Sequence, residues 1–93
     1  MTIWDFADSI NKNLIITRHA NQNSRYTASF QDSEIKRGSC LESVYGQGSS
    51  ALRAIDDYWE QIQGKRIIFN AMNNHRQEFT IPINLGEEDE SKD

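Results

Sequence analysis

Three side chains in this sequence could hold a soft metal ion or supply a nucleophile and its base: His19, Cys40 and His75. They stand far apart along the chain, and no Cys-x-x-Cys or His-x-x-x-His pair brings two of them together. Cysteine catalysis needs a base within hydrogen-bond reach and a third group that orients it, and the spacing indicates neither. We therefore expect no metal site, no cofactor and no enzymatic activity. Cys40 is expected to be a small strand residue and His75 an exposed loop residue.

A phosphate cradle is the second chemistry to weigh, because Gly46-Gln47-Gly48 directly precedes an amphipathic pattern. Glycines let backbone amides approach an anion at a helix start. A Walker motif would need a lysine after its last glycine, and a dinucleotide fingerprint would need a third glycine within a parallel β-α-β unit. Neither requirement is met. The segment instead predicts a tight turn, with Ser49 or Ser50 capping the helix that follows.

Carboxylates are the third chemistry, and they gather on one predicted helix. Asp56 and Asp57 are adjacent, so their side chains diverge by about 100° and cannot share a proton. Asp56 and Glu60 share a helix face, with Arg53 one turn earlier. Two interpretations stay open: a solvated surface laced with ion pairs, or an acidic stripe that meets a basic partner.

Charge along the chain is uneven. The chain has 93 residues and a net charge of −4, and residues 87–93, EEDESKD, carry this whole excess. Such a run repels itself and lacks apolar anchors, so we expect residues 1–86 to form one domain and residues 87–93 to be a disordered acidic tail. The tail either keeps the protein dissolved or acts as a polyanion toward a basic partner. The candidate partner-binding residues are Asp56, Asp57, Glu60, Glu87, Glu88, Asp89 and Glu90.

Composition and length limit the class of protein. With 37% hydrophobic and 26% charged residues, the chain fits one small folded domain. No apolar run reaches the roughly 18–20 residues of a membrane span. The start, MTIWDFADSINKN, lacks the basic and apolar regions of a secretory signal, and the lone cysteine fits a reducing compartment. We expect a cytoplasmic protein that does not associate with membranes.

The elements that must position these residues follow from periodicity. Apolar spacing predicts a helix from Thr2 to about Asn13 and a second from Ala51 to Gln63, and alternation is clearest over Arg25–Gln31. The charged segment Asp32–Gly38 is expected to be a connection. The predicted strands are 14–19, 25–31, 39–45, 67–70 and 77–83. The fold class is therefore α+β: an antiparallel sheet of about five strands in the order α-β-β-β-α-β-β, with the helices packed on one face.

Two families share this outline. From the first helix to Gln63 the chain resembles a double-stranded RNA-binding domain, with GQGSS and ALRAIDDYWEQI in the places of that family's turn and second helix. That family holds phosphates with lysines at the start of this helix, where the present chain has Ser49 to Leu52 and only Arg53 is basic. The stretch RYTASF, followed by GQGSSALRAIDDYWEQI, is similar to HicB-like antitoxins. The members of that family block a partner protein.

A third resemblance is to small bacteriophage-encoded proteins, through EIKRG, YGQG, AIDDYWEQIQGKRIIFNA and a late R-x-E-F-x-I-P. Some compact acidic phage proteins of this size are anti-CRISPR inhibitors. This resemblance implies a non-enzymatic protein-binding inhibitor, acting in the cytoplasm of a host cell. It would block a host defence nucleoprotein such as a CRISPR effector nuclease. The alternative is a HicB-like antitoxin or regulatory module, or a double-stranded RNA-binding-like domain, that binds one cognate partner.

The missing lysines generate a first testable prediction. Because only Arg53 is basic at the start of the second helix, the protein should bind duplex RNA or DNA weakly at best in about 150 mM salt, where phosphate contacts survive only when several bases act together. A titration with labelled duplexes measures this. A submicromolar dissociation constant would contradict the prediction and favour the nucleic-acid alternative.

Overall fold

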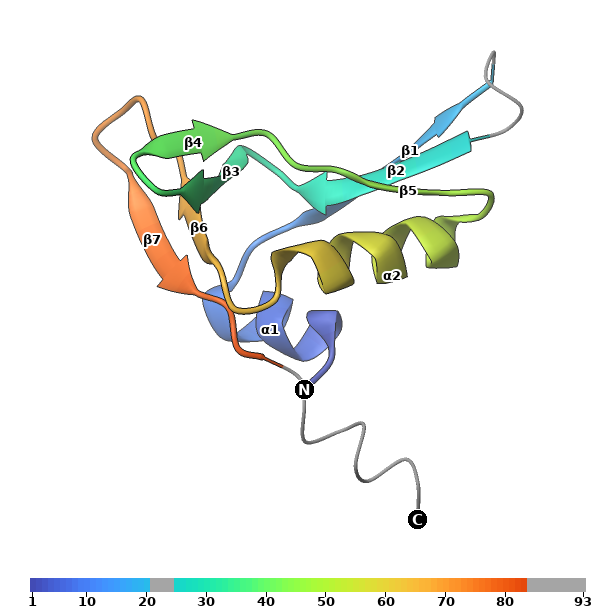
Figure 1. The fold of residues 1–93 in the computed structure, drawn as a ribbon, viewed down its shortest axis with the longest axis horizontal. Helices are drawn as coiled ribbons and strands as arrows, with labels where there is room; N and C mark the ends of the chain where they lie inside the picture. Colours follow the sequence, from blue (N-terminus) through green and yellow to red (C-terminus); the bar gives the residue numbers. More distant parts are fainter. Residues whose placement is uncertain (21–24, 84–93) are drawn as a thin grey trace.

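A computed structural model describes residues 1–20 and 25–83 of the chain (Figure 1). Within these residues the fold has two helices and seven strands, and all strand pairs are antiparallel. The helices are α1 (Ile3–Ile10) and α2 (Ala51–Ile62). The strands are β1 (Leu14–His19), β2 (Arg25–Phe30), β3 (Ser33–Arg37), β4 (Cys40–Glu42), β5 (Gly46–Gly48), β6 (Arg66–Phe69) and β7 (Gln77–Thr80).

The predicted α+β class with antiparallel pairing is confirmed, but the strands divide into two sheets. One sheet has the order β1-β2-β5 and the other β4-β3-β6-β7. The chain leaves the first sheet after β2, builds β3 and β4 in the second, and returns to the first at β5. In Figure 1 the two sheets diverge above α2, and α1 lies below α2.

Two of the strands lie where the sequence predicted none. Most of the segment expected to be a charged connection forms β3, because Ile35 points into the core while its neighbours Glu34 and Lys36 take the opposite face. The predicted strand at 39–45 is shorter and ends at Glu42. The glycine segment expected to be a turn is β5, which pairs with β2.

Close packing explains the glycines of β5. A Cβ atom on Gly46 would overlap the carbonyl oxygen of Ala54 and the backbone nitrogen of Tyr58. A Cβ on Gly48 would lie 2.6 Å from the backbone nitrogen of Ala54. Strand β5 therefore rests directly on the backbone of α2, which is the close approach that only glycine permits.

Helix α2 matches its prediction closely. Ser50 caps it by accepting a hydrogen bond from the Arg53 backbone N–H at 3.2 Å. One face is buried, and burying a side chain of the size of Ile55 contributes about 1.5–3 kcal/mol. The buried residues of this helix are Ala54, Ile55, Tyr58, Trp59 and Ile62.

Helix α1 also begins as predicted. Thr2 and Asp5 form a reciprocal capping box, with both hydrogen bonds at 3.1 Å. The helix ends earlier than expected, because Asn11 takes a left-handed conformation with φ of 56°. Its Trp4 is half exposed, whereas Trp59 on α2 is buried, so Trp4 is the tryptophan that faces solvent.

Aromatic rings fill the core between the helices and both sheets. The Phe30 ring meets the rings of Phe6, Tyr58 and Phe69 at centroid distances of 6.0 Å. The Tyr58 hydroxyl oxygen accepts a hydrogen bond from the Phe30 N–H at 3.1 Å. Burial raises the pKa of this hydroxyl above its usual value.

The last described strand, β7, lies at the edge of its sheet. Strand β7 ends at Thr80, and Pro82 follows two residues later. Beyond the strand, the chain remains attached to the segment before β6, because the Ile81 N–H donates a hydrogen bond to the Lys65 carbonyl at 2.8 Å. In the described parts of the chain, no helix has the length and apolarity needed to cross a membrane.

The contact between β5 and α2 generates the second prediction. Replacing Gly46 with Ala should lower the free energy of unfolding by about 3 kcal/mol or more, because backbone atoms occupy the space that a methyl group needs. The control is Gly38→Ala, where no atom lies within 4 Å and only the left-handed φ of 60° costs about 1 kcal/mol. Chemical denaturation measures both. Equal losses for the two variants would contradict the close packing.

Candidate functional site

The soft ligands of the sequence stay apart in the fold. His19 lies on β1 with its Nε2 atom 3.0 Å from the Thr27 hydroxyl, Cys40 is exposed on β4, and His75 follows β6 in a loop. Over residues 1–20 and 25–83, no group of three His, Cys, Asp or Glu side chains is placed to hold a metal ion.

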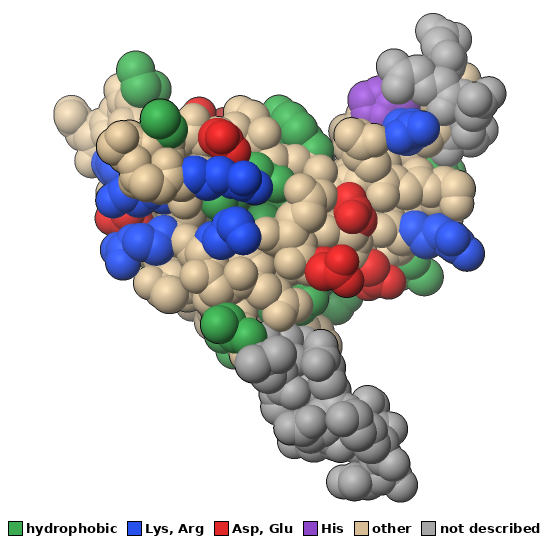
Figure 2. Space-filling model, in the orientation of Figure 1, with side chains coloured by type: hydrophobic (Ala, Val, Ile, Leu, Met, Phe, Trp, Pro, Cys, Tyr) green, Lys and Arg blue, Asp and Glu red, His purple; other side chains and the backbone are tan. Residues whose placement is uncertain are grey.

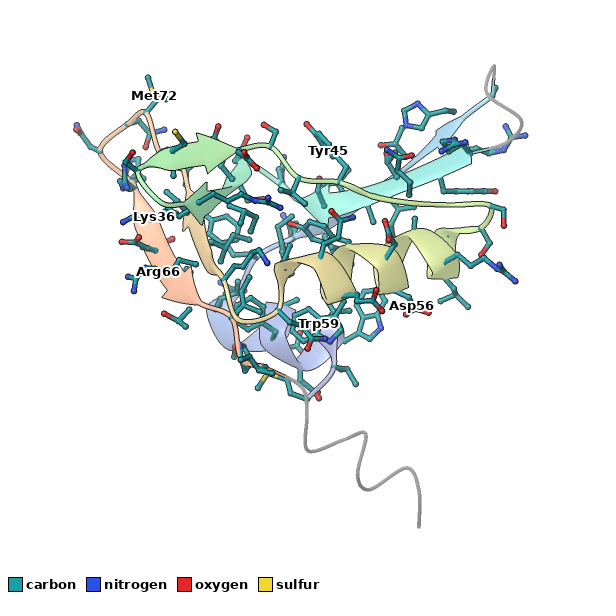
Figure 3. All side chains as sticks on the ribbon, in the orientation of Figure 1. Lys36, Tyr45, Asp56, Trp59, Arg66 and Met72 are labelled. Carbon is teal, nitrogen blue, oxygen red and sulfur yellow. The ribbon has the colours of Figure 1, made fainter. Side chains whose placement is uncertain are left out.

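The predicted acidic stripe on α2 divides into two roles. Asp56 and Glu60 are exposed, and acidic side chains gather over this helix in Figure 2. Asp57 is half-buried, and its Oδ2 atom accepts a hydrogen bond from the Gln47 backbone N–H at 2.8 Å. The same oxygen accepts another from the Gln61 amide at 2.9 Å. Asp57 therefore fastens α2 to β5, whereas Asp56 (labelled in Figure 3) and Glu60 are exposed to solvent.

Arg53 was one candidate for neutralising this stripe. In the part of the chain that the structure describes, no ion pair joins it to Asp56, Asp57 or Glu60. Asp56 and Glu60 consequently keep their charge available to another molecule. The candidates in the acidic tail, Glu87, Glu88, Asp89 and Glu90, lie outside the described residues.

Basic side chains gather on the sheet of β3, β4, β6 and β7, where several have acidic partners. The Arg66 Nε donates to Glu78 Oε2 at 3.0 Å, and the Lys36 Nζ lies 3.8 Å from the same oxygen. The hydrogen bond from Arg66 lowers the pKa of Glu78. Arg37 pairs with Glu42 at 2.9 Å. Figure 2 shows these cations to the left of the acids on α2.

A polar hollow of about 480 Å³ lies where the β6–β7 loop meets the end of α1. Lys12, His75 and Arg76 line it together with amide side chains. The Lys12 ammonium donates to the Gln77 amide oxygen and stands 5.0 Å from the centre of the Phe69 ring. The Lys12 ammonium therefore already has partners within the fold. For this reason we favour the exposed acids of α2 over this hollow as a binding site.

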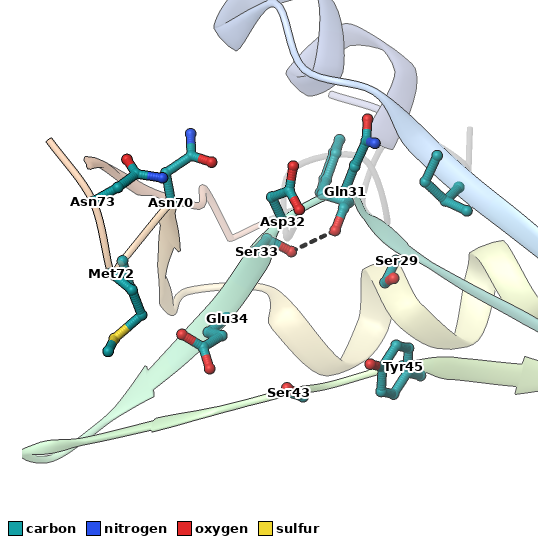
Figure 4. Close-up of a pocket in the computed structure, with 13 residues that line it drawn as sticks. Ser29, Gln31, Asp32, Ser33, Glu34, Ser43, Tyr45, Asn70, Met72 and Asn73 are labelled. Atoms are coloured by element: carbon teal, nitrogen blue, oxygen red, sulfur yellow. Dashed lines mark hydrogen bonds between the residues drawn. The ribbon is translucent and has the colours of Figure 1, made fainter. Parts of the chain in front are cut away.

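A groove of about 530 Å³ lies between the two sheets (Figure 4). Its lining comes from β1, the β2–β3 turn, the link before β5 and the loop after β6. The side chains that line it include Ile15, Asp32, Glu34, Tyr45 and Met72. Sequence reasoning missed this site, because four separate segments build it and none carries a recognisable motif.

No protein-family model, curated protein or solved structure matches this chain. The resemblances to RNA-binding, antitoxin and phage proteins therefore remain predictions. Function has to follow from the surfaces themselves.

The two roles of the neighbouring aspartates generate the third prediction. Asp57→Ala should lower the free energy of unfolding by about 1–2 kcal/mol, because it removes an ionised acceptor from two hydrogen bonds. Asp56→Ala should change it by less than about 0.5 kcal/mol, since its side chain is exposed. Urea denaturation compares the two variants. Identical stabilities would show that Asp57 does not fasten β5.

Proposed function

We propose that this chain is a non-enzymatic protein-binding module that sets carboxylates against a basic surface of a partner protein. One observation carries the proposal: Asp56 and Glu60 stand exposed one turn apart on α2, while the opposite face of that helix is buried in the core. Neither carboxylate has an ion-pair partner among the residues that the structure describes. Their charge is free to act on another molecule.

The scaffold under these two acids suits such a contact. Tyr58 and Trp59, which lie between Asp56 and Glu60 in the sequence, are buried in the core. Rotation or translation of α2 would expose these side chains and disrupt core packing. Carboxylates on a fixed helix lose little conformational entropy when a partner binds. A charged patch of this kind speeds association and selects basic partners more than it adds raw affinity.

In its narrower form, the proposal is a phage-encoded inhibitor of a host defence nucleoprotein, such as a CRISPR effector nuclease, acting in the cytoplasm of the host. The groove that holds nucleic acid in such a complex is basic, because it neutralises phosphates. Carboxylates on α2 compete for the same lysines and arginines. The tail residues Glu87, Glu88, Asp89 and Glu90 add long-range attraction in this scheme.

The alternative is a HicB-like antitoxin or a double-stranded RNA-binding-like domain with one cognate partner. The nucleic-acid version is disfavoured by the start of α2, where Ser49, Ser50 and Leu52 stand in place of lysines. The acids further along the helix would repel a phosphate backbone. The antitoxin version differs from the leading proposal in the identity of the partner and not in the mechanism of the acidic face.

The fourth prediction tests the acidic face by charge reversal. The tagged protein captures its partner from cells that contain the natural target, and the complex is then measured kinetically. The double variant Asp56→Lys, Glu60→Lys should bind at least about tenfold more weakly, because like charges now face the partner's basic surface. The control, Asp8→Lys with Glu42→Lys, makes the same change in net charge at exposed positions away from α2.

Two outcomes would contradict the proposal. If the helix variant binds as tightly as the natural protein, the interface does not use the acidic face of α2. If both double variants weaken binding equally, net charge and not a defined surface drives the association. High salt should reduce the difference between the variants, since it screens exposed charges.

A further inference from the structure

We infer that the groove between the two sheets binds a protein segment in which a lysine or arginine side chain is flanked by apolar side chains. The inference rests on the proposed function, since it takes protein binding as given, and it adds a second contact surface and the chemistry of what fills it. Three observations on the described residues support it: apolar side chains line the groove, its carboxylates have no ion-pair partner there, and no basic side chain of these residues lines it.

Topology creates the groove. The chain crosses from one sheet to the other between Phe30 and Ser33, and it crosses back over Ser43–Tyr45, so two neighbouring crossings leave a space between the sheets. The loop after β6 closes a third side with Asn70 and Met72. Backbone contacts hold the walls, because Asn70 donates its N–H to the Asp32 carbonyl at 3.0 Å. The groove is therefore built into the fold and needs no partner to form.

Large apolar side chains border the groove and remain exposed. Ile15 is 41% exposed, Tyr45 is 54% exposed and Met72 is 95% exposed, and each comes from a different segment. Figure 4 shows Tyr45 and Met72 on opposite sides of Glu34. A single exposed hydrophobic residue is ordinary, but several around one concave surface are typical of an interaction site. The rim therefore favours apolar side chains in the segment that binds.

The carboxylates of the groove lack the partners that other acids of the same sheet have. Glu78 and Glu42 each pair with an arginine, at 3.0 Å and 2.9 Å. Glu34 sits half-buried on β3, and among the described residues it has no ion-pair partner. Asp32, in the turn before β3, likewise has no ion-pair partner among the residues that the structure describes.

The described lining of the groove contains no basic side chain that would neutralise these carboxylates. Of the described side chains that line the groove, none is a lysine, arginine or histidine. A half-buried carboxylate is screened less by water than an exposed one, so Glu34 should attract a cation more strongly than Asp56 or Glu60 does. A phosphate-bearing ligand would meet two acids and no base. Charge complementarity therefore selects a cationic protein side chain as the occupant.

A second copy of this chain also presents cations. Arg37 and Arg66 hold carboxylates within their own chain, but Arg53 and Arg76 are exposed and have no ion-pair partner among the described residues. In line with the proposed function, we assign the groove to a segment of a different protein, and self-association is an outcome that the test must detect.

The test uses a defined tripeptide, acetyl-Leu-Arg-Leu-amide, titrated into the full-length protein and followed by the shifts of backbone amide resonances. The largest shifts should fall on residues 29–34, 43, 45 and 70–73, which line the groove. Replacing arginine in the peptide with citrulline, its neutral isostere, should weaken binding about fivefold, the upper range for one ion pair near a surface. The variant Glu34→Gln should bind the arginine peptide more weakly than the natural protein does, by a similar factor. Glu60→Gln, a matched change outside the groove, should leave the peptide's affinity unchanged.

Each other result overturns the inference in a distinct way. Shifts centred on Asp56 and Glu60 would reject the groove and leave the proposed function intact. If the arginine and citrulline peptides bind with equal affinity, the groove does not recognise the positive charge of the peptide. The same conclusion follows if Glu34→Gln binds the arginine peptide as tightly as the natural protein does. A dimer in sedimentation that Glu34→Gln dissolves would show that a second copy is the occupant. The proposed function fails separately, through the charge reversals on α2.

Discussion

At the point where the two sheets diverge, the backbone N–H of Phe30 donates a hydrogen bond to the Tyr58 hydroxyl oxygen. This bond gives a partner to a buried donor that no strand can pair. Gln31 donates its N–H to Asn13 on the β1 side, so the N–H of Phe30 points to the opposite side, toward β5. Strand β5 pairs with β2 no further than Ala28, which leaves this donor without a strand partner. An unpaired buried N–H costs about 1–3 kcal/mol, and Tyr58 removes that cost. The divergence of the sheets, and the groove that it creates, depend on this contact.

Helix α2 connects the core to both candidate surfaces. Its inner face carries Tyr58 and accepts the glycines of β5, and its outer face carries Asp56 and Glu60. Asp57 lies at the border, where it ties the helix to the same strand. The placement of charge on the outside therefore follows from packing on the inside. A partner that meets these acids meets a surface whose shape the core has already fixed.

Local patterns predicted the elements whose stability is local. The Thr2–Asp5 capping box, the Ser50 cap and the apolar stripe of α2 were all visible in the sequence, because each involves residues a few positions apart. Strand β3 was missed, since only Ile35 among its charged neighbours signals a buried face. Strand β5 was missed because glycines usually mark turns, whereas here they permit contact with a helix. The role of Asp57 and the lining of the groove depend on segments far apart in sequence, and no local pattern encodes such contacts.

The glycines of β5 also have a consequence for ancestry. Gly46 and Gly48 meet α2 at Ala54 and Tyr58, and Ala54 is itself fully buried. Any larger side chain at the two glycines would strike backbone atoms. Ala54 and Tyr58 are fully buried, and Tyr58 also accepts the Phe30 hydrogen bond, so few substitutions at these four positions leave the fold intact. Their spacing, Gly-x-Gly, five residues, Ala, three residues, Tyr, is thus a compact fingerprint. It would mark a distant descendant of this chain after the rest of the sequence had changed beyond recognition.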